Sequence, residues 1–150
     1  MNEKHKPINE QWGSYPETVC YFQGDEEVMV DLRIPLPPAT RNGLSALGLG
    51  EPFGILTAFN PRGVDLEDAE NSKRASDLEA ELVSLGLEFV RVDCCSPDRA
   101  HCECSVAVVA PKEQLLDMAR RWEQIAIFWF DGGLFWIEGA IRPGTLPLPL

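Results

Sequence analysis

Basic residues are scarce in this chain. Its 150 residues include 13 Lys and Arg against 24 Asp and Glu, so the formal net charge is −11. Proteins that bind nucleic acids draw much of their affinity from Lys and Arg side chains that neutralise phosphates. The charge balance therefore argues against a DNA- or RNA-binding protein. It suits a soluble protein or the binding of a basic protein partner.

Long apolar runs are also missing. The longest, Ile125 to Phe130, has the length of a strand and is much shorter than a membrane span. Residues 1–13 are polar and lack the apolar segment of a signal peptide. We therefore expect a cytoplasmic protein without membrane association, in which residues 1–13 form a flexible arm.

Histidine occurs only as His5 and His101, and no catalytic motif accompanies either residue. The sequence has no Walker loop, no His-Glu-x-x-His pair and no Ser-His-Asp order. These absences argue against the enzyme classes that such motifs define, and we expect no cofactor. They leave open whether the chain is an enzyme.

The five cysteines are an odd number, which favours reduced thiols over a disulfide framework. Most of them lie in the segment 94–104. Tetrahedral zinc sites usually take two separated pairs of ligands, and adjacent thiols fit that geometry poorly. Small buried cysteines are the favoured interpretation. The alternative is a metal site formed by Cys94, His101, Cys102 and Cys104.

Apolar periodicity predicts strands over residues 15–22, 28–34, 53–59, 87–92, 103–110, 125–130 and 134–138. Capping residues and prolines predict helices over residues 40–47, from Asp65 or Asp68 to Gly86, and from Pro111 to Trp122. From residue 53 onward this order is β-α-β-β-α-β with one extra strand, as in the ferredoxin-like fold.

We therefore predict a single α+β domain over residues 14–140, with a ferredoxin-like core and helices on one face. Its mostly antiparallel sheet is extended by an N-terminal hairpin, and the Pro-rich tail, residues 141–150, is extended. A Rossmann-like sheet is the alternative. The two predicted hairpins and the absence of a Gly-rich phosphate loop argue against it.

Two polar residues continue the apolar stripe of the main helix. Counting back from Leu82 and Leu78 by three or four residues reaches Arg74 and Asn71, so both are predicted to face inward. A buried guanidinium needs a partner, which can be a carboxylate, carbonyl groups or an anionic ligand. The alternative is an ion pair with Glu70 at the rim of the stripe.

The turn after the strand 53–59 lies beside this pair. Asn60 and Pro61 are turn-forming residues, and the following helix start offers free N–H groups and a positive dipole end. With Arg62 and Arg74, these groups predict a site for a carboxylate or phosphate. The alternative is a well-formed turn that binds nothing.

Several of these residues also make the chain resemble a known family. Thr57 to Pro61, the pattern Glu70-Asn71-x-x-Arg74 with the leucines after it, and Ala119 to Phe128 are similar to a bacterial family called domain of unknown function 3293. The resemblance extends over residues 15–138. It departs at Glu123, where the family usually has Gly. It implies a compact single domain and supplies no activity.

The resemblance also groups polar positions. The expected ligand-binding residues are Thr57, Asn60, Asn71, Arg74 and Gln124. Their amide and guanidinium groups suit a small polar or anionic molecule, such as a nucleotide or an amino-acid derivative, at the end of the strand 53–59. If the site is catalytic, Glu103 is the candidate general base and Arg74 the anion stabiliser.

The alternative function is an acidic interaction module, such as an inhibitor, an immunity-type protein or an adaptor. The main helix carries a run of acidic residues that includes Asp77, Glu79 and Glu81. Such a module predicts a contiguous negative patch and no polar pocket.

Overall fold

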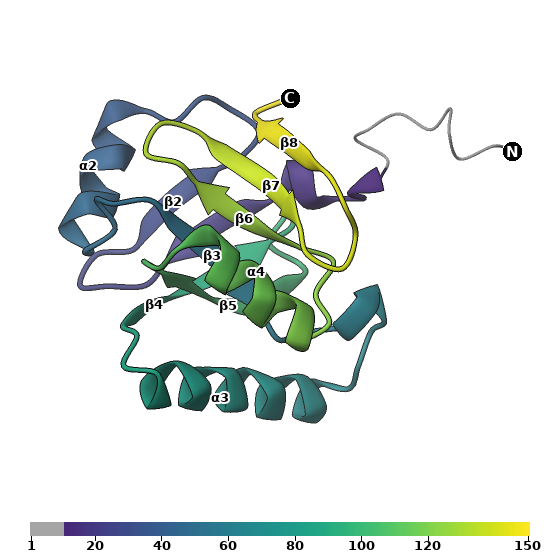
Figure 1. Cartoon of the computed structure of the whole chain (residues 1–150). Coiled ribbons are helices and arrows are strands. Elements are labelled where there is room, and N and C mark those ends of the chain that lie inside the picture. The colour runs from purple at the N-terminus through teal and green to yellow at the C-terminus, as the bar shows by residue number, and fades with distance from the viewer. Residues whose placement is uncertain (1–10) are drawn as a thin grey trace, which may run out of the picture.

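Residues 11–150 are described by a computed structural model, and they form one curled sheet with helices on both sides (Figure 1). The strands are β1 (Val19–Phe22), β2 (Val28–Asp31), β3 (Phe53–Thr57), β4 (Phe89–Cys95), β5 (Cys102–Val108), β6 (Ala126–Phe130), β7 (Phe135–Gly139) and β8 (Thr145–Leu148). Their order is β2-β1-β4-β5-β3-β6-β7-β8, and every neighbouring pair is antiparallel. Residues 1–10 of the predicted N-terminal arm lie outside the described residues.

The described α-helices are α2 (Pro38–Ala46), α3 (Asp68–Ser84) and α4 (Lys112–Arg121), and the 3-10 turns are η2 (Tyr15–Glu17) and η3 (Pro61–Gly63). The three predicted helices are therefore present with shifted ends. α3 stops where Gly86 adopts a φ of +71°, and the Leu87 N–H donates back to the Leu82 carbonyl at 3.0 Å. Glycine tolerates this left-handed conformation, so it ends the helix without steric strain.

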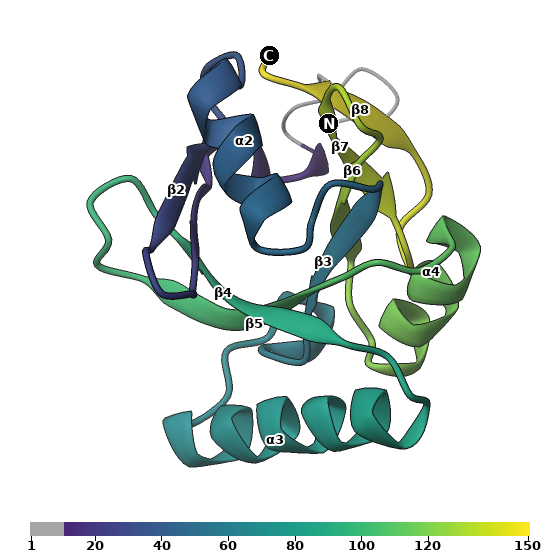
Figure 2. The ribbon, with the colours of Figure 1, turned by 90° about the vertical axis from the view of Figure 1, so that its left-hand side faces the viewer.

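Apolar side chains on the two faces of the sheet form two separate cores. On one face, the rings of Phe53, Phe130 and Phe135 lie 4.8–5.9 Å apart, centroid to centroid, and Leu44 of α2 packs into the same core. On the other face, leucines of α3 and α4 pack against β3, β5 and β6. Figure 2 shows α2 and α3 on opposite sides of the sheet.

A glycine in β3 lets α4 pack closely against the sheet. A Cβ atom on Gly54 would lie 2.7 Å from a methyl group of Leu115, and Leu115 is fully buried in α4. Any side chain at position 54 would therefore push the helix away from the strand. The close contact fixes the position of α4 and of the turn that follows it.

The predicted α+β class is confirmed. The ferredoxin-like arrangement is not confirmed by the order of the eight-stranded sheet, and the prediction of helices on one face is wrong because α2 packs into the opposite core. A Rossmann-like sheet is excluded, since every strand pairing is antiparallel. Within residues 11–150, no helix is both long and apolar enough to cross a membrane.

The chain ends differ from the sequence-based expectation in three places. The predicted strand 15–22 begins with the 3-10 turn η2, because Pro16 has no N–H to donate to a ladder. Residues 145–148 of the Pro-rich tail form β8, which pairs with β7 and buries Leu148. Trp12, within the predicted arm, is only 3% exposed and belongs to the core on the face of the sheet that α2 covers, called the core of α2 below.

Candidate functional site

Two amide side chains fix the turn after β3. Asn60 has a left-handed backbone, with a φ of +46°. Its N–H donates to Asn71 Oδ1 at 3.0 Å, and Asn71 Nδ2 donates back to Asn60 Oδ1 at 2.8 Å. The Leu66 N–H donates to the same Asn60 oxygen at 3.0 Å. These bonds satisfy the buried polar groups, so the two amides shape the site from within the protein.

The side chain of Glu103, on β5, is held by a hydrogen bond from this amide pair. Asn60 Nδ2 donates to Glu103 Oε2 at 3.0 Å. Burial raises the pKa of Glu103, the Asn60 hydrogen bond opposes that rise, and the negative charge of Asp65 adds to it. The carboxyl group therefore holds its proton more tightly than an exposed glutamate does.

Thr57 also lies at this corner, and its hydroxyl is used internally. Thr57 Oγ1 donates to the Cys104 carbonyl at 2.8 Å and accepts from the Phe59 N–H at 3.1 Å. These bonds tie the end of β3 to β5. The side chain therefore positions the strand end that carries the site.

Arg74 and Gln124 hold the backbone behind the turn. Arg74 Nε donates to the Ala58 carbonyl at 2.6 Å, and Arg74 Nη2 to the Trp122 carbonyl at 2.8 Å. Gln124 Nε2 donates to the Phe59 and Trp122 carbonyls at 3.0 and 3.2 Å. Of the partners expected for Arg74, the structure shows backbone carbonyls. Carbonyl groups thus accept from two of the three guanidinium nitrogens, and the guanidinium also lies 5.2 Å from the centre of the Trp122 ring.

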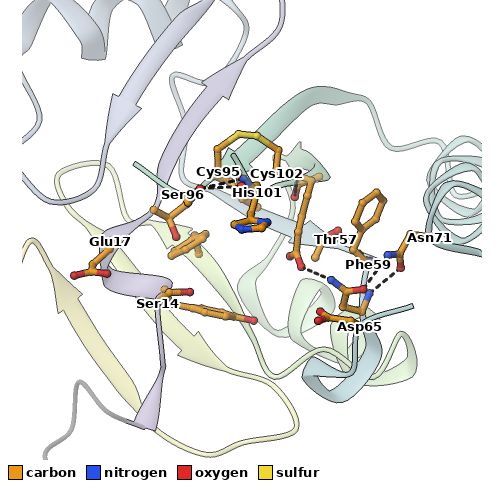
Figure 3. A pocket seen from close by; sticks show the side chains of 18 of the residues that line it. Ser14, Glu17, Thr57, Phe59, Asp65, Asn71, Cys95, Ser96, His101 and Cys102 are labelled. Carbon is orange, nitrogen blue, oxygen red and sulfur yellow. Dashed lines mark hydrogen bonds between the residues drawn. A yellow bond between two sulfur atoms is a disulfide. The ribbon is translucent and has the colours of Figure 1, made fainter. Parts of the chain in front are cut away.

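A cleft of about 810 Å³ opens in front of Glu103. Figure 3 shows Ser14 and Glu17 on one side, Asp65 and Asn71 on the other, and His101 with the Cys95–Cys102 disulfide between them. Thr57, Asn60 and Asn71 line this cleft, whereas Arg74 and Gln124 do not. The structure thus divides the predicted ligand-binding residues into a lining group and a supporting pair.

The cleft is acidic on its polar side and aromatic on its apolar side. Its carboxyl groups are Glu17, Asp65, Asp68 and Glu103. Tyr15, Phe59 and Phe128 supply the aromatic surface, and His101 is the one imidazole among the lining residues described. Burial, and then the nearby charges of Glu103 and Cys94, raise the pKa of Tyr15, so its hydroxyl stays protonated.

The cysteines differ from the expectation of reduced thiols. Cys95 and Cys102 form a disulfide, because the antiparallel register of β4 and β5 places them directly opposite each other. Cys102 is therefore not free to bind a metal. Cys94 Sγ instead lies 3.9 Å from Cys20 Sγ. Within residues 11–150, no group of three or more His, Cys, Asp or Glu is placed to hold a metal ion.

Three acidic residues of α3, namely Asp77, Glu79 and Glu81, are paired within the protein. Lys73 pairs with Asp77 at 2.8 Å, Arg91 with Glu79 at 2.8 Å, and Arg121 with Glu81 at 3.1 Å. Each carboxylate thus has a basic neighbour. This arrangement gives no support to a free acidic patch on these three residues.

Sequence reasoning missed the N-terminal wall of the cleft. Ser14, Tyr15 and Glu17 lie far from Glu103 in the sequence, and β1 brings them beside it by pairing with β4. The signal available was Pro16, which marks a turn where a strand was expected. It indicates a break in the strand and says nothing about what the turn faces.

A family model described as "Protein of unknown function (DUF3293)" matches residues 56–127. This segment, slightly less than half of the chain, is similar to the DUF3293 family. The DUF3293 match is shorter than the expected range, residues 15–138, and it contains all six residues proposed from the sequence for the site. The N-terminal wall of the cleft lies outside it. Comparisons with curated proteins and with solved structures found no match.

Glutamate at position 123, where the resemblance implies glycine, leaves the turn intact. Glu123 has a φ of +59°, a conformation that glycine adopts without strain. Its carbonyl accepts from the Arg62 N–H at 2.7 Å, and its carboxylate pairs with the Arg62 guanidinium at 2.9 Å. The tight turn before β6 is therefore present with glutamate at position 123, where the resemblance implies glycine.

Proposed function

We propose that the cleft in front of Glu103 binds a small polar molecule. The observation that carries this proposal is a largely buried carboxyl group that faces the cleft with one oxygen engaged. Within the part of the chain that the structure describes, Asn60 is the only group that donates a hydrogen bond to the Glu103 side chain. Burying a carboxyl group without full compensation costs stability, and binding sites retain such groups.

The construction of the corner supports the same proposal. The Asn60 and Asn71 amides bond to each other, and Arg74 and Gln124 bond to backbone carbonyls, so these residues hold the cleft in one shape. A site held by its own hydrogen bonds loses little entropy when a ligand binds. The proposal is one of binding. If a reaction accompanies it, Glu103 is the group placed for proton transfer.

A variant that fills the cleft tests this proposal. Ala100 lines the cleft and Ala80 lies exposed on α3 away from it, so Ala100→Trp and Ala80→Trp form a matched pair. A mixture of amino-acid, nucleoside and sugar fragments is screened by ligand-observed NMR. We expect some fragments to bind the unmodified chain and Ala80→Trp but not Ala100→Trp. If no fragment distinguishes the two variants, the cleft is not a binding site.

We infer that the central strands, in the order β4-β5-β3-β6, together with α3 and α4, are a ferredoxin-like unit. The support is that this segment starts at β3, alternates as β-α-β-β-α-β, and packs both helices on one face. The remaining strands extend this unit at both edges, and β1 carries the N-terminal wall of the cleft with it.

A further inference from the structure

Carboxyl groups surround the cleft, and they come from separate parts of the chain. Glu17 belongs to η2, Asp65 to the loop before α3, Asp68 to the first turn of α3, and Glu103 to β5. Within residues 11–150, no Lys or Arg lines the cleft. Of the described guanidinium groups, that of Arg142 acts on Tyr15 from outside the lining and donates to the Gln11 carbonyl.

These four carboxyl groups are also not used in ion pairs. The described ion pairs involve Asp31, Glu27, Asp77, Glu79, Glu81, Asp117, Glu123 and Glu138. None of the four cleft acids is among them. Described acids outside the cleft, such as Asp25, Glu51 and Glu88, are in no ion pair either, but the four cleft acids differ from them in lining one shared cleft. Their charge is available to a ligand.

The fields of these groups overlap inside the cleft. Asp65 contributes to the raised pKa of Glu103, and Glu103 contributes to the raised pKa of Tyr15, so charges from opposite sides act on one another. An anion placed in this space meets repulsion from several directions, whereas a cation relieves it. The aromatic rings of Tyr15 and Phe128, whose centroids lie 5.6 Å apart, form the adjacent apolar surface.

We propose that the ligand of this cleft carries an ammonium or guanidinium group beside an apolar part, and that it is not a phosphate or a nucleotide. This inference rests on the proposed function, because it names the class of molecule that the same cleft takes. The expectation of an anion drew on the helix start with Arg62 and Arg74. Neither arginine lines the cleft: Arg62 pairs with Glu123, and Arg74 donates to two backbone carbonyls.

Matched sets of probes test the charge of the ligand. Each set keeps one aromatic body and changes the end group, as in phenethylamine, phenethyl alcohol and phenethyl phosphate. Binding is measured by NMR titration to the full chain and to Ala100→Trp and Ala80→Trp. In the sets that the cleft binds, we expect the amine to bind at least about tenfold more tightly than the phosphate. We expect this preference in Ala80→Trp and its loss in Ala100→Trp.

Two charge variants show which groups cause the preference. Glu103→Gln keeps an oxygen to accept from Asn60, and Asp65→Asn changes an exposed loop residue, so both are expected to fold. Glu51→Gln, an exposed position outside the cleft, is the control. We expect each cleft variant to reduce the preference for the amine severalfold and the control to leave it unchanged.

The possible outcomes separate this inference from the proposed function. If phosphates or neutral probes bind in the cleft as tightly as the amines, the inference is overturned and the proposed function stands. An amine preference that survives Ala100→Trp reflects the overall negative charge of the chain and also overturns the inference. If no probe set and no fragment distinguishes Ala100→Trp from Ala80→Trp, both proposals fail together.

Discussion

At the scale of single residues, the corner after β3 shows why polar side chains can lie on an apolar stripe. Asn71 is 5% exposed and Gln124 3% exposed, yet their hydrogen bonds are made within the protein. Arg74 also bonds within the protein, to two backbone carbonyls, and its guanidinium lies over the Trp122 ring. The inward direction of Asn71 and Arg74 follows from helical periodicity. The identity of their partners does not, because a carbonyl, a carboxylate and a ligand satisfy a donor equally well.

The raised pKa of Glu103 predicts a pH dependence of stability. The native state holds this proton at pH values where the unfolded chain, with the usual pKa of 4.5, has released it. The carboxyl group therefore favours folding below that usual pKa, and the contribution is lost as the pH rises through the raised native pKa. Glutamine does not titrate. The free energy of unfolding of Glu103→Gln minus that of the unmodified chain should thus increase with pH between about 4 and 8.

Urea denaturation at a series of pH values measures this difference. The exposed Glu51→Gln variant serves as the control and should show a difference that changes little with pH. A difference for Glu103→Gln that decreases as the pH rises would mean that the native pKa is lowered. That result would remove burial as the dominant influence on this carboxyl group.

Glu123 allows a direct measurement of backbone strain. Both Glu123→Gly and Glu123→Ala remove the exposed ion pair to Arg62, so their difference isolates the backbone. Alanine is strained at a φ of +59° and glycine is not. We expect the Gly variant to be more stable than the Ala variant by about 1 kcal/mol, measured by urea denaturation. Equal stabilities would show that position 123 is not left-handed in solution.

At the scale of elements, the sequence predicts most of the sheet because each strand carries its own apolar pattern. The hairpin of β6 and β7 is an example. Asp131 accepts from the N–H groups of Gly133 and Leu134 at 2.7 and 2.8 Å, which is local turn chemistry that the motif shows directly. β8 escapes prediction because its prolines indicate a loop. Pro147 is tolerated there because β8 is an edge strand of the sheet.

Only one side of the cleft can be predicted from the sequence, because local patterns do not show which distant strands pair. Its β3 side comes from residues near one another in the sequence, and periodicity places them together. Its other wall comes from η2 and the β4–β5 loop, which meet β3 only through the register of β1, β4 and β5. The disulfide depends on the same register, so a count of cysteines does not reveal it.

The Cys95–Cys102 disulfide closes a short hairpin loop, and its effect on stability can be measured. In the chain-entropy description, a loop of this length stabilises the native state by about 2 kcal/mol. We expect dithiothreitol to lower the free energy of unfolding of the unmodified chain by about that amount. The double variant Cys95→Ala, Cys102→Ala should be insensitive to the reductant. An unmodified chain that is equally insensitive would mean that the two thiols stay reduced.

At the scale of the whole molecule, one curled sheet serves two cores and one cleft. α3 and α4 cover one face, and their core contains Leu56 and Ala58 of the chain that leads into the site. The opposite face holds the core of α2 and leaves room beside η2 for the cleft. The acidic residues that give the chain its net charge of −11 differ in whether they have a basic partner. On α3, Asp77, Glu79 and Glu81 have basic partners, whereas Asp68 of the same helix and the other three cleft acids are in no described ion pair.

The C-terminal strand closes one edge of this arrangement, and a matched pair of leucines tests whether it is part of the folded domain. Leu148 is 3% exposed and packs in the core of α2, whereas Leu150 is 70% exposed. Truncating a buried leucine removes apolar contacts and leaves a cavity. We expect Leu148→Ala to lower the free energy of unfolding by about 3 kcal/mol and Leu150→Ala by less than about 0.5 kcal/mol, both measured by urea denaturation. β8 pairs with β7, and β7 pairs with β6. The loss of stability caused by Leu148→Ala therefore acts on the same sheet that carries the cleft. Similar small effects for both variants would instead show that the tail detaches from β7 in solution.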